Sequence, residues 1–139
     1  MTRKNTTPSL LFCAVFLRTV FFLAPVGASA AGESGWRIYS EAGNGDVHFY
    51  DASRVETSAD LRTVWTRIRY KRNVMAAASY QSLLEIDCSG RTERTLQRTF
   101  FSDRDWQQPA MKTDTKPKKK RRIRAGSVFE RLAEIVCSP

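Results

Sequence analysis

The stretch RTVWTRIRYK, residues 62–71, decides the fold class. Its side chains alternate with a period of two, so they divide between two faces: Val64, Thr66, Ile68 and Tyr70 on one, and Trp65, Arg67 and Arg69 on the other. β-Branched and aromatic residues at this spacing are typical of a half-buried strand. The sequence therefore predicts a β-strand at residues 62–71.

Similar segments lie on both sides of this stretch. The sequence predicts further strands at residues 36–39, 47–50, 80–87 and 92–101, a tight bend at 51–55, and turns at 43–45, 58–60 and 89–90. If side chains alternate regularly along the strand at residues 92–101, four of them lie on the same face: Arg94, Leu96, Arg98 and Phe100. Short turns with no intervening helix favour an antiparallel meander.

The C-terminus carries the signature of a helix. Ser127 is a favourable N-cap, and Glu130 follows three residues later, as in a capping box. The residues after it form one apolar stripe at helical spacing: Val128, Phe129, Leu132, Ile135 and Val136. The expected fold class is α+β, with a core that includes Trp36, Val64, Ile68, Leu84, Ile86, Leu132 and Val136.

Residues 1–30 are predicted to be a cleavable signal peptide. Arg3 and Lys4 precede an apolar stretch at 10–26, and residues 28–30 read ASA, a small-x-small cleavage site. The alternative is an uncleaved membrane anchor, which Arg18 within the apolar stretch disfavours. Cleavage would leave one domain, residues 31–139, in an exported protein.

Two cysteines, Cys88 and Cys137, remain after the predicted cleavage, 49 positions apart. Export delivers them to an oxidising compartment, which favours an intramolecular disulfide between the helix and the sheet. Two unpaired thiols or one intermolecular bond are the alternatives. Cys13 follows Phe12 rather than a small residue, so no lipid anchor is expected and a periplasmic or secreted location is favoured over surface attachment.

The excess positive charge is concentrated in one segment. The formal net charge is +9, and residues 112–124 hold eight basic residues against one acid, Asp114. Residues 103–124 are predicted to form a flexible basic loop, with candidate binding residues Lys116, Lys118, Lys119, Lys120, Arg121, Arg122 and Arg124. The loop could be simply solvated, or it could bind a polyanion or an anionic membrane surface. Export argues against nucleic acid as the partner.

No catalytic site, metal site or cofactor is predicted. His48 is the only histidine in the chain and is expected on the polar face of a strand. Without a second histidine, a nucleophile–base pair has no obvious base. Glu85 and Asp87 share a strand face and are expected to pair with arginines such as Arg94 and Arg98 rather than to hydrolyse a glycan.

The chain resembles the bacterial surface-adhesin protein E-like family. The resemblance rests on an ordered series of short matches: Trp36, Phe49-Tyr50-Asp51 with Ser53, Val64-Trp65 with Arg67, Tyr70-Lys71, Glu85-Ile86-Asp87-Cys88, Arg94, Gly126-Ser127, Leu132 and Val136-Cys137. It implies about six antiparallel strands, a C-terminal helix packed on the sheet, and a disulfide between the two cysteines.

The resemblance also implies a function. Surface adhesins of this type in Gram-negative bacteria bind host proteins such as vitronectin, laminin and plasminogen, so a non-enzymatic binding module of the cell envelope is expected, with host matrix proteins or acidic glycans as partners. The alternative is a periplasmic accessory or structural protein with no host partner. The missing lipid-attachment cysteine and the lysine–arginine run depart from the family pattern.

Overall fold

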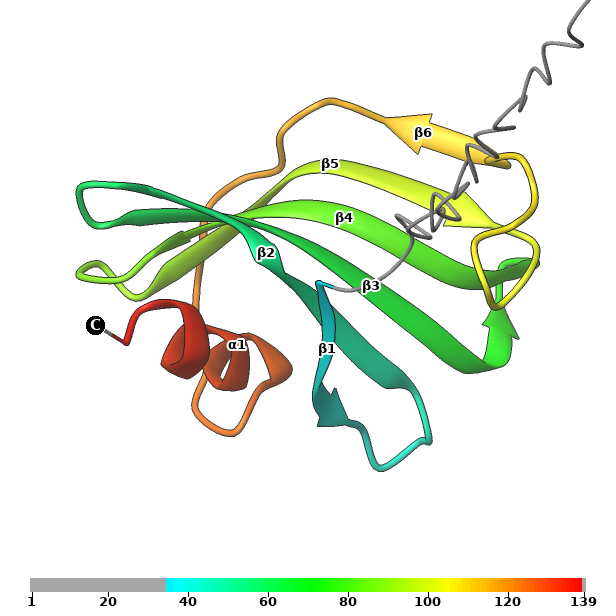
Figure 1. The fold of residues 1–139 in the computed structure, drawn as a ribbon, viewed down its shortest axis with the longest axis horizontal. Helices are drawn as coiled ribbons and strands as arrows, with labels where there is room; N and C mark the ends of the chain where they lie inside the picture. Colours follow the sequence, from blue (N-terminus) through cyan, green and yellow to red (C-terminus); the bar gives the residue numbers. More distant parts are fainter. Residues whose placement is uncertain (1–34, 139) are drawn as a thin grey trace, which may run out of the picture. The chain divides into compact units, whose positions relative to one another are not determined.

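The computed structural model describes residues 35–138, and the predicted signal peptide, residues 1–30, lies outside these residues. The elements, in chain order, are β1 (Trp36–Glu41), β2 (Val47–Ser58), β3 (Leu61–Val74), β4 (Ala77–Asp87), β5 (Thr92–Phe101), β6 (Lys112–Asp114), β7 (Arg121–Arg122) and α1 (Val128–Val136). Figure 1 shows α1 against one face of the sheet. We call this the inner face and the opposite one the outer face.

The strands form the predicted antiparallel meander. They lie side by side in chain order from β1 to β6, and β7 pairs with β5. The long strand predicted at residues 62–71 is the middle of β3, which pairs with β2 on one side and β4 on the other. The α+β architecture predicted from the sequence is therefore confirmed.

The inner face carries the core. Val64 lies directly opposite Leu84, and both side chains are almost fully buried. The core cluster joins the sheet to the helix and consists of Tyr39, Val64, Leu84, Ile86, Ile123, Leu132, Ala133 and Val136. Five of the seven predicted core residues are buried: Val64, Leu84, Ile86, Leu132 and Val136.

Trp36 and Ile68 are only partly buried, so the prediction that they belong to the core is wrong. Trp36 belongs to the outer face, where the guanidinium of Arg67 lies 4.2 Å from its ring centroid and 4.6 Å from that of Trp106. A cation–π contact of this kind can form at a partly exposed site. Ile68 lies on the inner face in a part that is left open.

Two local predictions on the strands are wrong because the ladders contain irregularities. Residues 51–55 are part of β2 rather than a bend, and the register with β3 shifts between Tyr50 and Val55. In β5, Leu83 lies opposite Gln97 and Leu84 opposite Thr95, so Leu96 is an extra residue, as in a β-bulge. Arg94 and Arg98 consequently lie on opposite faces.

Residues 112–124, which we call the basic segment, contain more secondary structure than the sequence predicts. β6 pairs with β5 at residues 98–100 and β7 pairs with β5 at residues 92–93. The side chain of Ile123 is buried, and its N–H donates to the Arg91 carbonyl over 2.9 Å. A loop without secondary structure is thus the wrong prediction for residues 112–114 and 121–122, because the edge of β5 offers unpaired backbone groups.

The helix begins as predicted and is tied to the sheet at its end. The Ser127 hydroxyl accepts from the Glu130 N–H over 3.2 Å, and the Glu130 carboxylate accepts from the Gly126 N–H over 2.7 Å. Cys88 and Cys137 form the predicted disulfide, with their Cα atoms 5.7 Å apart.

Candidate functional site

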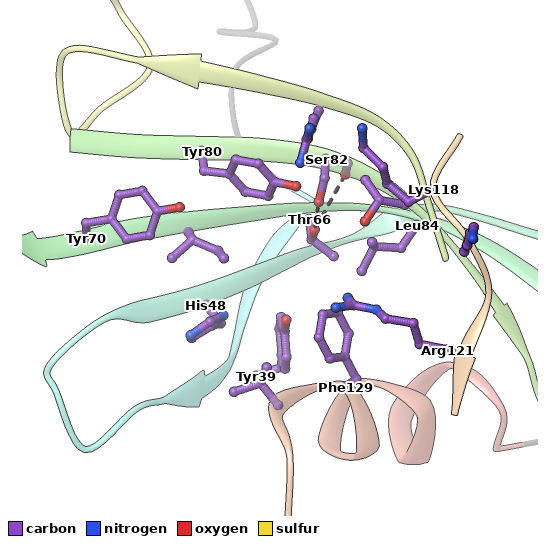
Figure 2. Close-up of a pocket in the computed structure, with 15 residues that line it drawn as sticks. Tyr39, His48, Thr66, Tyr70, Tyr80, Ser82, Leu84, Lys118, Arg121 and Phe129 are labelled. Atoms are coloured by element: carbon purple, nitrogen blue, oxygen red, sulfur yellow. Dashed lines mark hydrogen bonds between the residues drawn. The ribbon is translucent and has the colours of Figure 1, made fainter. Parts of the chain in front are cut away.

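A cavity of about 470 Å³ lies between the inner face of the sheet and the first turn of α1 (Figure 2). We call this cavity the basin. Strands β1 to β5, the basic segment and α1 all contribute to its lining, which consists of Tyr39, His48, Thr66, Ile68, Tyr70, Tyr80, Ser82, Leu84, Thr95, Arg98, Lys118, Lys119, Arg121, Val128 and Phe129. Its volume falls within the range of roughly 300–1,000 Å³ that small-molecule sites occupy.

His48 forms part of the wall of the basin. It lies opposite Ile68 on the inner face and is buried against the Tyr39 ring, with the ring centroids 5.8 Å apart. The prediction of a polar strand face for His48 is therefore wrong. Burial lowers the pKa of His48, although the nearby charge of Asp46 acts in the opposite direction. Its buried Nδ1 atom has no hydrogen-bond partner among the described residues.

Several hydroxyl residues lie at the basin floor, where Thr66 and Ser82 are each 2% exposed. The Thr66 and Ser82 hydroxyls lie 2.8 Å apart and share a hydrogen bond, and Figure 2 shows the Tyr80 hydroxyl pointing towards Ser82. Burial raises the pKa of Tyr80 and of Tyr70, so both phenols stay protonated at neutral pH. The floor can therefore both donate hydrogen bonds to a ligand and accept them.

Cations form one rim of the basin. Asp114 accepts hydrogen bonds from Lys118 (2.8 Å) and from Arg98 (2.9 Å). The Lys118 ammonium, the Lys116 N–H and the Arg98 guanidinium together hold the pKa of the Asp114 carboxyl well below its usual range. One carboxylate thus neutralises part of the charge of two cations, and Lys119 adds a third on the same rim.

The structure separates the seven predicted binding residues into three groups. Lys118, Lys119 and Arg121 line the basin. Lys120 lies within 4.0 Å of both the Glu85 and the Asp87 carboxylates. The remaining three are exposed and form no ion pair within the described chain: Lys116, Arg122 and Arg124.

Arg121 has a structural partner that the sequence does not reveal. Its Nη2 atom lies 2.8 Å from Oε1 of Glu93, a carboxylate with only 3% of its side chain exposed. The other oxygen of Glu93 is buried without a hydrogen bond among the described residues. A buried carboxylate is costly without its counter-ion.

Arg121→Gln is therefore expected to lower the free energy of unfolding by about 1–3 kcal/mol, because it leaves Glu93 buried and unpaired. The adjacent Arg122→Gln is the matched control, with an expected change within about 0.5 kcal/mol. Urea denaturation of the two variants measures the difference. Equal losses would show that the Arg121–Glu93 pair contributes nothing to stability.

The arginine pairing predicted for the acidic residues of β4 is confirmed for Glu85 and is wrong for Asp87. Arg94 donates to Glu85 over 3.0 Å on the outer face, whereas Arg98 pairs with Asp114 instead. Asp87 accepts from the Gly90 N–H, which together with Ser89 and Lys120 lowers its pKa. In the described part of the chain, no three His, Cys, Asp or Glu side chains come close enough to hold a metal ion.

Sequence reasoning missed the hydroxyl half of the site. Thr66, Tyr80, Ser82 and Thr95 line the basin but were assigned no role. The available signal was position: Thr66 and Ser82 occupy inner-face positions in line with Val64 and Leu84, and both are buried. Buried hydroxyls on an otherwise apolar face indicate either a polar network or a ligand site.

The fold that carries the basin is a meander sheet with one helix tethered to it by a disulfide. The chain belongs to the surface-adhesin protein E family, whose model matches residues 36–138. A family of surface adhesins implies an exported protein. Residues 35–138 contain no helix with the length and apolar character needed to cross a membrane.

Solved structures with the same fold come from Haemophilus influenzae. Crystal form II of its protein E is 14% identical, with a TM-score of 0.58 over 75% of this chain and 87% of that one. Protein E from the non-typeable bacterium is also 14% identical, with a TM-score of 0.55 over 75% and 76% of the two chains. A comparison with curated proteins gives no match.

Proposed function

We propose that this protein is a non-enzymatic binding module of the cell envelope that contacts acidic host partners through its basic segment. The partner classes are those that the family suggests: matrix proteins such as laminin, vitronectin and plasminogen, or acidic glycans. Export through a cleaved signal peptide at residues 1–30 remains part of this proposal.

One observation carries the proposal. The basic segment is paired with β5 at both β6 and β7, so its charges are presented at fixed places rather than along a free chain. Lys116, Arg122 and Arg124 are exposed there and have no ion-pair partner in the described chain. Exposed cations held on a sheet edge attract a negatively charged surface and accelerate association with it.

Changing Lys116, Arg122 and Arg124 together to glutamine is expected to weaken binding to immobilised heparin and to laminin by about tenfold or more. Each exposed charge pair is worth roughly 0.2–1 kcal/mol, and three are removed. The same loss of charge elsewhere, at Arg37, Arg72 and Arg131, is the matched control, because these side chains are also exposed. Biosensor measurements at two salt concentrations compare the two variants.

Equal weakening in both triple variants would show that net charge, rather than the basic segment, drives the contact. Wild-type protein that binds neither laminin, vitronectin, plasminogen nor heparin, and that fractionates only with the periplasm, would favour the periplasmic accessory protein instead.

A further inference from the structure

We propose that the basin is a separate ligand site for a single acidic sugar unit, a hydroxyl-bearing ring that carries a sulfate or carboxylate group. This goes beyond the proposed contact of the basic segment with a macromolecular partner. The two use different residues, because Lys116, Arg122 and Arg124 do not line the basin.

The first argument is the arrangement of polar groups around an apolar base. Ile68 and Leu84 from the sheet and Phe129 from α1 offer apolar contact to a ring. The hydroxyls of Thr66, Ser82 and Tyr80 lie beside them at the floor (Figure 2). Sites of this kind combine apolar contact area with a few placed polar groups that fix the orientation of the ligand.

The second argument is electrostatic. Arg98, Lys118, Lys119 and Arg121 line one side of the basin, whereas the two carboxylates that pair with them, Asp114 and Glu93, do not line it. The cations therefore outnumber the acids that balance them. Charge-assisted hydrogen bonds from guanidinium and ammonium groups are the strongest available to a sulfate or a carboxylate.

The test uses a trisulfated heparin disaccharide, its unsulfated counterpart, a uronic acid and inorganic sulfate as probes. Amide NMR titration of the mature wild-type domain is expected to show saturable shifts at Thr66, Ser82 and Thr95. Free sulfate is expected to bind at least about tenfold more weakly than the trisulfated disaccharide. The unsulfated disaccharide keeps its uronate carboxylate and measures how much of the affinity the sulfates contribute. The uronic acid distinguishes carboxylate from sulfate as the preferred group.

Thr95→Phe should block the basin and reduce disaccharide affinity about tenfold or more. Gln97→Phe places the same ring on the outer face of the same strand, opposite Leu83, and should leave affinity unchanged. Tyr80→Phe, which removes only a hydroxyl, keeps the test available if Thr95→Phe does not fold. The Lys116, Arg122 and Arg124 triple variant should keep disaccharide binding, so the two proposals fail separately.

Three results would overturn the proposal. Amide shifts confined to Lys116, Arg122 and Arg124, with none at Thr66, Ser82 or Thr95, would place the ligand on the exposed part of the basic segment. Equal affinity for free sulfate would reduce the basin to a simple anion site. Unchanged affinity in both Thr95→Phe and Tyr80→Phe would show that the ligand does not enter the basin.

Discussion

Replacing Cys88 and Cys137 together with serine is expected to lower the free energy of unfolding by about 4 kcal/mol under oxidising conditions. The disulfide closes a loop with a sequence separation of 49, and the chain-entropy model assigns this amount to the restriction of the unfolded chain. For a domain of this size, whose total stability is roughly 5–15 kcal/mol, that loss is large.

The measurement is urea denaturation of wild type and variant, each with and without reductant. Reduced wild type should unfold at the same urea concentration as the variant. The helix end keeps one further link to the sheet in both proteins, because Arg62 Nε donates to the Val136 carbonyl over 3.1 Å. If the variant is less stable than wild type by the same amount with and without reductant, serine itself, rather than the lost bond, causes the effect.

Leu132→Ala is expected to cost about 3 kcal/mol of folding stability. The Leu132 side chain is fully buried between α1 and the sheet, in the same cluster as Val64 and Ile86. Truncation removes apolar burial and leaves a cavity, and leucine-to-alanine changes of this kind cost roughly 2–5 kcal/mol.

Ile135→Ala is the matched control on the same helix. Ile135 is 39% exposed, so its truncation should cost about 1 kcal/mol or less. Thermal and urea unfolding of both variants test the pair. Similar losses of stability at the two positions would contradict the conclusion that the helix face containing Leu132 is the principal contact between α1 and the sheet.

The regular parts of this fold could be predicted because, within each element, the apolar residues recur at one constant spacing. Alternation in residues 62–71 identifies β3, and the Ser127–Glu130 pair with its apolar stripe identifies α1. The disulfide followed from export and from the count of two remaining cysteines. In each case local pattern and tertiary structure agree.

The errors fall where tertiary pairing overrides local pattern. The bulge at Leu96 reverses the alternation of β5, so Arg94 and Arg98 separate although their spacing suggests one face. Residues 112–114 and 121–122 form strands only because the edge of β5 is available to them. Such pairing depends on residues distant in the chain, which no local window contains.

The candidate site was predicted only in part for a related reason. A charge run is visible in the sequence, so the cations Lys118, Lys119 and Arg121 were found. The lining of the basin gathers His48, Thr66, Ser82 and Thr95 from separate strands, and none of these residues is unusual alone. Only the register of the meander brings them together.

The bulge at Leu96 also affects how relatives of this protein should be aligned. Because Leu96 is an extra residue in β5, Thr95 and Arg98 share a face although three positions separate them. In a homologue with a regular strand, residues aligned one to one with these two would face opposite sides. Whether a relative retains the basin therefore depends on this single insertion as much as on the side chains themselves. Alignments of the family should place a gap at Leu96 before residue conservation is scored.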